Sequence, residues 1–363
     1  MANTVHPADI ETELEKVRDS LQGISKMRAC LFNLIIYAKK SQRVGYLNEM
    51  IQKIIQRFPC RIIFITYDES CSNHRLKTAV SVITADQGMY EIASDLIEVE
   101  AGAKDHLKVP FVILPHILPD LPIYLVHADD PSFDNPVGRK LERLAHRIIF
   151  DSEAACHLPA YAKAVLGHNE HFHADVADLN WARIEGWRQL FAGVFRRQES
   201  LAEIDRAEKI RIRYNSRETD DFRHTDVQAI YLQAWLAVQL GWRLKKATDG
   251  SNFAYEGEFG RVDIELVSDK TATVFPGTIS SIAISTDRAI EYRFKRKRRH
   301  PHHVIIEKSS PELCSLPTDY VLDKDISGQS LVREICYKGT SSHYVKVLQL
   351  VANIEKESLD NES

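Results

Sequence analysis

The sequence predicts two domains, an α/β domain over residues 1–155 and an α+β domain over residues 156–363. A length of 363 residues exceeds that of most single domains. The first part alternates compact apolar runs with helical spacing, which is typical of a Rossmann-like doubly wound sheet. The second part changes to helices and then to an apolar period of two, which indicates an antiparallel meander.

The first predicted element is a helix over residues 9–23, because apolar residues recur there at steps of three and four. The compact apolar run 29–38 is typical of a buried strand. A helix over 46–58 then leads to a second apolar strand over 60–67. This strand–helix–strand order has the length that a parallel crossover needs.

Segments 80–83 and 92–99 are predicted as two strands, or as a strand and a helix. Strands over 109–114 and 123–126 are expected to flank a rigid proline turn. No helix should run through this turn because of Pro115, Pro119 and Pro122. The first domain then ends with a helix and a short strand, predicted over 137–145 and 147–151.

In the second domain, residues 156–243 are predicted to be mostly helical. From residue 260 the apolar positions alternate, which predicts the strands of the meander. Helical spacing returns over 327–354.

Composition and charge limit the functional classes. A net charge of -4 provides no strong overall field for nucleic acid or an anionic membrane. No apolar run approaches the ~18 residues of a membrane-spanning helix. The opening segment MANTVHPADIETELEKV is polar and acidic, without the apolar core of a secretory signal. We therefore expect a cytoplasmic protein that binds neither membrane nor nucleic acid.

The six cysteines form no CxxC pair and no zinc-ligand spacing, so reduced thiols are expected. Cys30 and Cys60 fall in predicted buried strands and should be inert. Cys71 and Cys156 fall in predicted loops, which makes them the possible redox thiols.

Motifs of catalysis and cofactor binding are absent from the sequence. It contains no GxGxxG, GxxxxGK[ST], GxSxG or HExxH. The turn after the first predicted strand, residues 39–45, has a single glycine, too few for a close approach to a pyrophosphate. The sheet is therefore expected to lack the glycine loop, and we predict no catalytic residue, cofactor or metal.

Two clusters leave alternatives open. His168, His171 and His173 lie as close together in the sequence as metal ligands often do. Imidazoles at this spacing would converge on one ion only in an irregular loop, and the alternative is a polar connection before a helix. The basic run 293–299, followed by further histidines, could bind phosphate, nucleic acid, an acidic protein or a small anionic ligand. Alternatively, it is the solvated tip of a hairpin between two alternating strands.

A third segment combines two tryptophans with two arginines, the residue types that most often anchor interfaces. It could bind a partner, or its indoles could seal the junction between the domains. The candidate partner-binding residues are Asp178, Trp181, Arg183, Trp187 and Arg188.

Five blocks, in order, resemble the OpcA family of glucose-6-phosphate dehydrogenase assembly proteins. DLNWARIEGWRQLF at 178–191 resembles the family's "DL-W-R---WR" signature. The other blocks are FPCRIIFI at 58–65, VPFVILPHILPDLPIYLV at 109–126, RIIFDS at 147–152 and AIYLQAWLAVQLGW at 229–242. The chain departs from the family in the proline block, where Tyr124 and His127 replace a tryptophan pair, and in its basic run and tail after residue 310.

The resemblance implies a non-catalytic, chaperone-like partner of glucose-6-phosphate dehydrogenase that favours the active oligomer. Such a protein would act in carbohydrate metabolism, at the entry of the oxidative pentose phosphate pathway where NADPH is made. The alternative is an enzyme on a modified sugar- or nucleotide-binding sheet. It would use the polar residues near a strand end, namely Asp120, His127, Asp129 and Asp130.

Overall fold

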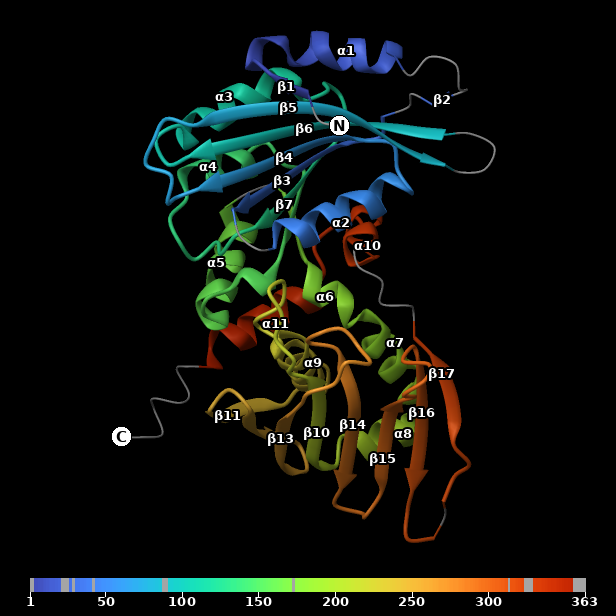
Figure 1. The fold of residues 1–363 in the computed structure, drawn as a ribbon. Coiled ribbons are helices and arrows are strands. Elements are labelled where there is room, and N and C mark those ends of the chain that lie inside the picture. Colours follow the sequence, from blue (N-terminus) through green and yellow to red (C-terminus); the bar gives the residue numbers. More distant parts are fainter. Residues whose placement is uncertain are drawn as a thin grey trace. The chain divides into compact units, whose positions relative to one another are not determined.

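A computed structural model describes residues 3–20, 26–27, 30–40, 43–86, 91–171, 174–312, 314–322 and 329–354 (Figure 1). The chain forms two compact units. The first unit contains Met1–Ala154, Gly167–Leu179 and Ser327–Thr340, and the second contains Ala155–Leu166, Asn180–Ile326 and Ser341–Ser363. The domain ranges 1–155 and 156–363, inferred from the sequence, remain a prediction.

The first unit is built on a nine-stranded sheet of order β1-β5-β6-β4-β3-β7-β8-β9, with β2 beside β6. The strands are β1 (Asn3–Val5), β2 (Lys26–Met27), β3 (Asn33–Lys39), β4 (Arg61–Asp68), β5 (Leu76–Asp86), β6 (Glu91–Gly102), β7 (Ile123–Ala128), β8 (Arg147–Phe150) and β9 (Asp175–Asp178). The helices are α1 (Ile10–Ser20), α2 (Val44–Ile55), α3 (Val109–Ile113), α4 (Pro136–Glu142), the end of α5 (Leu158–His171) and α10 (Gln329–Cys336). Short 3-10 turns are η1 (Pro7–Asp9), η2 (His106–Lys108), η3 (Leu114–His116) and η4 (Ser152–Ala154).

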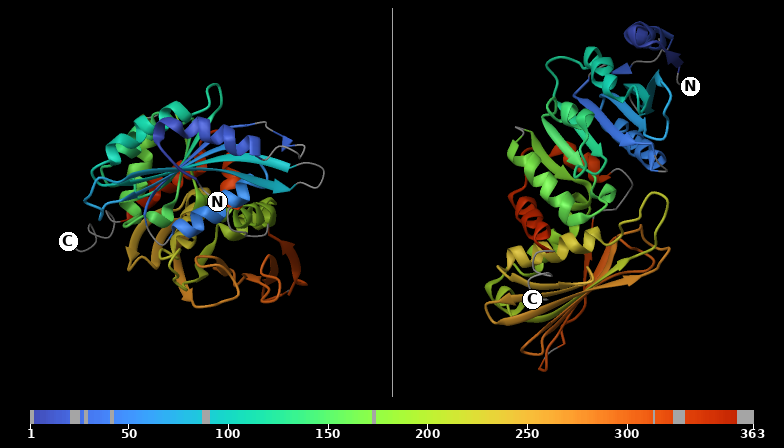
Figure 2. Two further views of the ribbon diagram at one scale, coloured as in Figure 1. Left: turned by 45° about the horizontal axis from the view of Figure 1, so that its top comes forward. Right: turned by 90° about the vertical axis from the view of Figure 1, so that its left-hand side faces the viewer.

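Six neighbouring strands of this sheet are parallel, in the order β6-β4-β3-β7-β8-β9. Numbered along the chain, this is the 3-2-1-4-5-6 order of dinucleotide-binding sheets. Strand β5 pairs antiparallel with β6. Both views of Figure 2 show α1 and α2 on opposite faces of the sheet. The predicted doubly wound arrangement is therefore present in this unit.

Most predicted elements of the first domain are confirmed, including the helices at 9–23 and 46–58, although residues 21–23 lie outside the described part. Segments 80–83 and 92–99 form two strands. The predicted strand at 109–114 is wrong, because Val109–Ile113 is helix α3. Pro110 stands at the start of that helix, where a missing N–H costs nothing. Helix α3 ends at Ile113 and the 3-10 turn η3, which includes Pro115, follows it directly; no helix continues through Pro119 and Pro122, as expected.

The second unit is built on an eight-stranded sheet of order β11-β12-β13-β10-β14-β15-β16-β17. Its strands are β10 (Ala207–Asn215), β11 (Arg243–Thr248), β12 (Asn252–Gly257), β13 (Gly260–Asp269), β14 (Ile279–Thr286), β15 (Glu291–Arg296), β16 (His303–Ser309) and β17 (Thr318–Val321). Its helices are the start of α5, α6 (Leu179–Arg183), α7 (Glu185–Val194), α8 (Gln198–Ile204), α9 (Val227–Gln239) and α11 (Ser342–Ala352).

The meander is confirmed from β14 to β17, where each strand pairs antiparallel with the next. The prediction that it begins at residue 260 is wrong, because β13 pairs with β12 and β10 and not with β14. The prediction that 156–243 is mostly helical misses two strands. Strand β9 pairs with β8 in the sheet of the first unit, and β10 pairs with β13 in parallel. The β10 sequence AEKIRIRYN has three charged residues among its first five, which hides the apolar alternation of Ile210 and Ile212. The helices predicted over 327–354 are confirmed as α10 and α11. Helix α9 packs against β10 and β13, and eleven of its residues are buried.

Candidate functional site

The carboxyl ends of the parallel strands in the first unit are filled by aromatic and imidazole rings. Tyr37 of β3 stacks on Tyr67 of β4 with ring centroids 5.3 Å apart, and Tyr67 stacks on His106 at 4.5 Å. Asn135 donates from Nδ2 to the Tyr37 hydroxyl at 2.7 Å, and that hydroxyl lies 2.7 Å from His106 Nε2. Burial lowers the pKa of His106, so a neutral imidazole can accept from Tyr37.

A buried carboxylate continues this ring cluster. Glu142 is 1% exposed, with Oε1 3.2 Å from His127 Nδ1 and Oε2 3.0 Å from His168 Nδ1. The Phe150 ring centroid lies 5.5 Å from the centroid of each imidazole. Burial alone would raise the pKa of Glu142, but the two imidazoles outweigh it and lower that pKa to about 2. Glu142 is therefore ionised and joins β7 to the end of α5.

Three of the four residues of the alternative enzyme hypothesis, namely His127, Asp129 and Asp130, have structural partners here. His127 is buried against Glu142. Asp129 accepts from the Tyr67 hydroxyl and, at 3.4 Å, from Asn135 Nδ2. Asp130 accepts from the backbone N–H of Ser132 at 2.9 Å, and Asp120 forms a turn with φ 62°. The strand end brings His127 and Asp129 to the ring cluster, where the ring centroid of His127 lies 5.7 Å from that of Tyr37 and Asp129 accepts from Tyr67.

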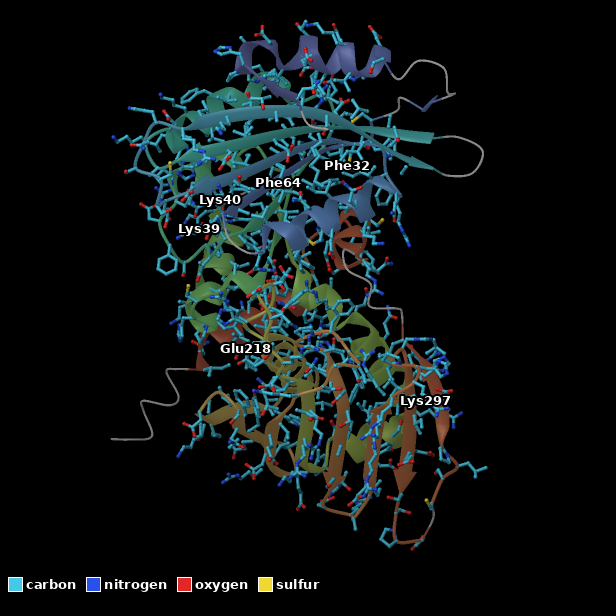
Figure 3. All side chains as sticks on the ribbon, viewed as in Figure 1. Phe32, Lys39, Lys40, Phe64, Glu218 and Lys297 are labelled. Atoms are coloured by element: carbon cyan, nitrogen blue, oxygen red, sulfur yellow. The ribbon has the colours of Figure 1, made fainter. Side chains whose placement is uncertain are left out.

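The turn after β3 also differs from a phosphate-binding loop. Lys39 and Lys40, labelled in Figure 3 at the end of β3, form ion pairs with Glu69 and Glu100. Gly45 is the one glycine of segment 39–45, and a Cβ added there would meet nothing within 4 Å. The glycine therefore serves no close backbone approach to another part of the described chain.

A pocket of about 580 Å³ opens in the second unit. Its walls come from three loops, those after β10 and after β13 and the turn between β15 and β16. The strand directions place all three loops at the same end of the sheet. The lining residues are Arg217, Thr219, Asp221, Phe222, Ala272, Thr273, Val274, Phe275, Pro276, Thr278, Arg296, Pro301 and His302.

A buried amide holds two of these loops together. Asn215, which is fully buried at the end of β10, donates from Nδ2 to Val274 O at 2.8 Å. Its Oδ1 accepts from the backbone N–H groups of Arg217 and Thr271, each at 3.1 Å. Gly277, at φ 76°, donates its N–H to Asn215 O at 2.8 Å. These bonds fix the pocket walls before any ligand arrives.

The Trp/Arg segment 178–188 lies partly beneath this pocket. Trp187 is 1% exposed, and the guanidinium of Arg296 lies 5.5 Å from its ring centroid. Arg183 lies 5.3 Å from the ring centroid of Phe222, and its Nη1 donates to Asn180 Oδ1 at 2.6 Å. The segment therefore contacts two pocket walls, at Phe222 and at Arg296.

The rest of this segment is also packed within the fold. Trp181 is buried, with Arg188 only 3.5 Å above its ring centroid. Asp178, in the first unit, accepts from the backbone N–H and hydroxyl of Ser152 at 3.2 and 3.0 Å. Both indoles are core residues. The role of the five residues in partner binding remains a prediction.

The predicted thiols differ in exposure. Cys60 is buried, and burial raises the pKa of its thiol. Cys30 is half-buried, so the expectation of a fully buried thiol is only partly met. Cys156 is exposed and Cys71 half-buried. Their redox role remains a prediction.

The structure shows where the histidine cluster and the basic run lie. His168 pairs with Glu142 and His171 Nδ1 lies 2.7 Å from Gly167 O, while His173 lies outside the described residues. Within the described part of the chain, no group of three or more histidine, cysteine or acidic residues could hold a metal ion. The basic run 293–299 lies on β15 and the hairpin turn that follows, where Figure 3 labels Lys297.

Comparison with known proteins decides the family. Residues 51–165 match the family model of the OpcA glucose-6-phosphate dehydrogenase subunit N-terminal domain. Residues 174–320 match the model of the corresponding C-terminal domain. The chain belongs to the OpcA family.

Two OpcA proteins named for the OxPP cycle are among its relatives. The Nostoc punctiforme protein is 26% identical over 220 residues, covering 58% of this chain and 43% of the relative. The Synechococcus elongatus protein is 23% identical over 220 residues, covering 59% of this chain and 45% of the relative. The chain thus spans less than half the length of these relatives.

A solved structure supports the fold alone. A super-repressor mutant of Gal80p from Saccharomyces cerevisiae aligns over 92% of this chain and 97% of its own, at 9% identity and a TM-score of 0.51. Among the described residues, no helix is long and apolar enough to cross a membrane.

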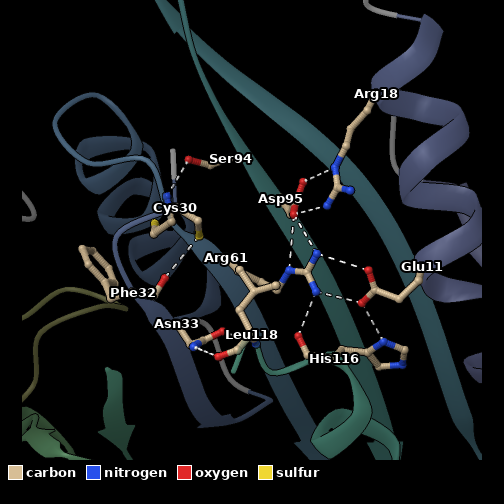
Figure 4. A network of polar contacts seen from close by, with 11 residues as sticks. Glu11, Arg18, Cys30, Phe32, Asn33, Arg61, Ser94, Asp95, His116 and Leu118 are labelled. Atoms are coloured by element: carbon tan, nitrogen blue, oxygen red, sulfur yellow. Dashed lines mark hydrogen bonds and ion pairs between the residues drawn. The ribbon is translucent and has the colours of Figure 1, made fainter. Parts of the chain in front are cut away.

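The OpcA block 58–65 contains a buried arginine with a structural role. Arg61, 3% exposed, donates from Nη1 to Glu11 Oε1 at 2.8 Å and from Nη2 to Asp95 Oδ2 at 3.0 Å (Figure 4). Its Nη1 also donates to His116 O at 3.0 Å. Arg18 of α1 forms a second ion pair with Asp95. This block therefore ties α1 and the proline block to the sheet.

Proposed function

We propose that this OpcA-family chain is a non-catalytic assembly and allosteric activation factor for glucose-6-phosphate dehydrogenase. It would act in the cytoplasm, in the oxidative pentose phosphate pathway, and support the supply of NADPH. The observation that carries the proposal is the filled strand end of the first unit. There, Tyr37, Tyr67, His106 and Glu142 occupy the edge at which parallel sheets of this order bind nucleotides.

The proposed mechanism is thermodynamic linkage. A protein that binds the assembled dehydrogenase more tightly than its free subunits shifts the equilibrium toward the assembly by that difference in affinity. Such a factor needs a stable surface and no chemistry of its own. The absence of nucleotide-loop and hydrolase motifs from the sequence is consistent with this role.

The enzyme alternative receives less support from the geometry. A general base at the strand end would have to reach a substrate proton. His127 is instead 2% exposed and paired with Glu142, and Asp129 accepts from Tyr67. We therefore propose that these groups stabilise the fold and that the chain is not an enzyme.

Within the Trp/Arg segment, we propose that Arg183 and Arg188 contribute to the partner surface and that Asp178, Trp181 and Trp187 support it. Both arginines are half-buried, whereas the other three side chains are buried. Arginine is enriched at the centres of interfaces because its planar group forms several directed hydrogen bonds.

The first test is co-purification of the chain with the glucose-6-phosphate dehydrogenase of the same organism, followed by mass measurement. A complex of defined mass and a raised dehydrogenase activity are expected. Absence of any complex at micromolar concentrations would overturn the proposal.

The second test compares Arg183→Ala with Arg288→Ala. The second change removes the same charge at an exposed turn between β14 and β15. Arg183→Ala should weaken binding by ~tenfold or more, equal to ~1.4 kcal/mol or more, while its melting temperature stays within a few degrees of wild type. Equal binding by both variants would remove Arg183 from the partner surface. A lowered melting temperature with a proportionate loss of binding would assign it a structural role.

A further inference from the structure

We propose that the pocket of the second unit is a binding site for a small organic anion, a phosphate monoester or carboxylate with an apolar body. The pocket volume of about 580 Å³ lies within the range of small-molecule sites in proteins. The basic run 293–299, for which an anionic ligand was one alternative, contributes Arg296 to this pocket. The inference stands independently of the proposed partner, because it concerns direct binding to this chain.

The position of the pocket is built into the sheet. Strands β10, β13 and β15 all run toward the same end, so their following loops converge there. Asn215 joins the first two of these loops through three hydrogen bonds of its side chain. Gly277 permits the close passage of the second loop, since a Cβ there would lie 3.1 Å from Gln228 Nε2 and 3.3 Å from Thr225 O. A pre-formed pocket loses less entropy when a ligand binds.

Cationic groups give the pocket its preference for an anion. Two arginines, Arg217 and Arg296, line the pocket, whereas Asp221 provides the only carboxylate among its described lining residues. Arg296 is held in place, since its Nε donates to Ile279 O at 2.8 Å and its Nη1 to Pro301 O at 2.6 Å. Arg217 is exposed and lines the pocket, and no ion pair of its guanidinium is found among the described residues. An incoming phosphate or carboxylate can therefore form charge-assisted bonds with Arg217.

Apolar groups and hydroxyls define the rest of the ligand. Phe222, Val274, Phe275 and Pro276 supply an apolar wall, and Phe275 is 51% exposed without a ligand. Threonine hydroxyls and Asp221 can bind polar groups on the ligand body. The combination matches an anionic head on an apolar or aromatic body that carries a hydrogen-bond donor.

The test uses phenyl phosphate, inorganic phosphate and phenol as probes, titrated by calorimetry into the full chain. Phenyl phosphate should bind with a saturable isotherm, and more tightly than either of the other two probes. Arg217→Ala should weaken phenyl phosphate binding by ~tenfold or more, because a hydrogen bond to a charged group is lost. The exposed position of Arg217 means that the variant should keep its melting temperature.

The matched control is Arg288→Ala, which removes the same charge from the turn at the opposite end of β14. It should bind phenyl phosphate like wild type. Three results would overturn the proposal: no saturable binding up to millimolar probe, equal affinity for phenol and phenyl phosphate, or equal loss of affinity in the two variants. None of these measurements involves the dehydrogenase, so the proposed function is tested separately.

Discussion

The two sheets differ at the end where their parallel strands finish. In the first unit this end is occupied by stacked rings, whereas in the second unit it forms an open pocket. In the first, Tyr37 and Tyr67 project from β3 and β4 and stack on each other, and His106 of η2 stacks on Tyr67. In the second, the strands end in long loops that surround an open pocket of about 580 Å³. The strand order alone would have placed a ligand in the first unit. Side chains at the strand ends therefore decide where a ligand can bind.

The difference has a simple physical basis. The ring cluster gains apolar contact and, at the hydroxyls of Tyr37 and Tyr67, hydrogen bonds from the chain itself, so these groups need no ligand for stability. The loops of the second unit satisfy their backbone groups through Asn215 and leave the side chains of Arg217 and Phe275 exposed. Exposed cationic and aromatic groups can gain free energy when they bind a partner or ligand.

The largest expected effect comes from the support beneath the pocket. Trp187→Ala should lower the free energy of unfolding by ~3–5 kcal/mol, because a fully buried indole leaves a cavity. Trp187 is 1% exposed and lies under Arg296. Chemical denaturation measures the change, with Leu316→Ala as the control, since Leu316 is 90% exposed and should alter stability by less than ~0.5 kcal/mol. A Trp187→Ala protein as stable as wild type would contradict the assignment of this indole to the core.

A smaller effect should appear at the filled strand end under acid conditions. The pKa of Glu142 is lowered to about 2 by its two imidazoles, despite burial. A folded pKa below the unfolded value of ~4.3 stabilises the fold above pH ~4.3, and this stabilisation is lost as the pH falls toward 2. We expect wild type to exceed Glu142→Gln in unfolding free energy by ~3 kcal/mol near pH 6.

The pH dependence of that difference is the decisive measurement. It should shrink steadily between pH ~4.3 and ~2, as protonation neutralises the wild-type carboxylate. Urea unfolding of both proteins at several pH values provides the curve, and the comparison cancels the contributions of other carboxylates. A difference that does not change with pH would mean that Glu142 stabilises the cluster through its shape and not through its charge.

Sequence reasoning was most successful where a pattern reports burial directly. The apolar runs that became β3, β4 and β8 were each located correctly, since a strand buried on both faces is apolar at nearly every position. Strand β10 was missed because its exposed positions are charged and its alternation covers few residues. Segment 109–114 was misassigned because prolines exclude a helix interior but allow a helix start.

The candidate sites were harder to predict than the fold. The segment 178–188 was recognised by composition, but its indoles are buried, since tryptophan serves cores and interfaces alike. The basic run 293–299 suggested an anion, and its Arg296 lines the pocket. The pocket itself was not predicted, because residues from 217 to 302 meet there only through the sheet topology. A second signal lies in the loop TATVFPGT at 271–278. This loop between two predicted strands contains three threonines, a phenylalanine and a glycine.

The smallest expected effect is the heat of NADP binding to the isolated chain, which should be zero. This measurement tests most directly whether the strand end of the first unit binds a nucleotide. A dinucleotide needs a glycine-rich turn whose N–H groups approach the pyrophosphate, whereas the cations of the turn after β3, Lys39 and Lys40, already pair with Glu69 and Glu100. The 2′-phosphate of NADP is itself a phosphate monoester, so the measurement uses the Arg217→Ala variant, in which the anion site proposed for the second unit is weakened. Calorimetry of this variant with NADP should therefore give no saturable heat at micromolar concentrations, and the chain alone should not oxidise glucose 6-phosphate. A melting temperature equal to that of wild type shows that the sample is correctly folded. A dissociation constant of ~1 μM for NADP in this variant, equal to ~8 kcal/mol of binding free energy, would require the ring cluster of Tyr37, Tyr67 and His106 to open. The comparison would then be wrong, and the enzyme hypothesis would regain its support.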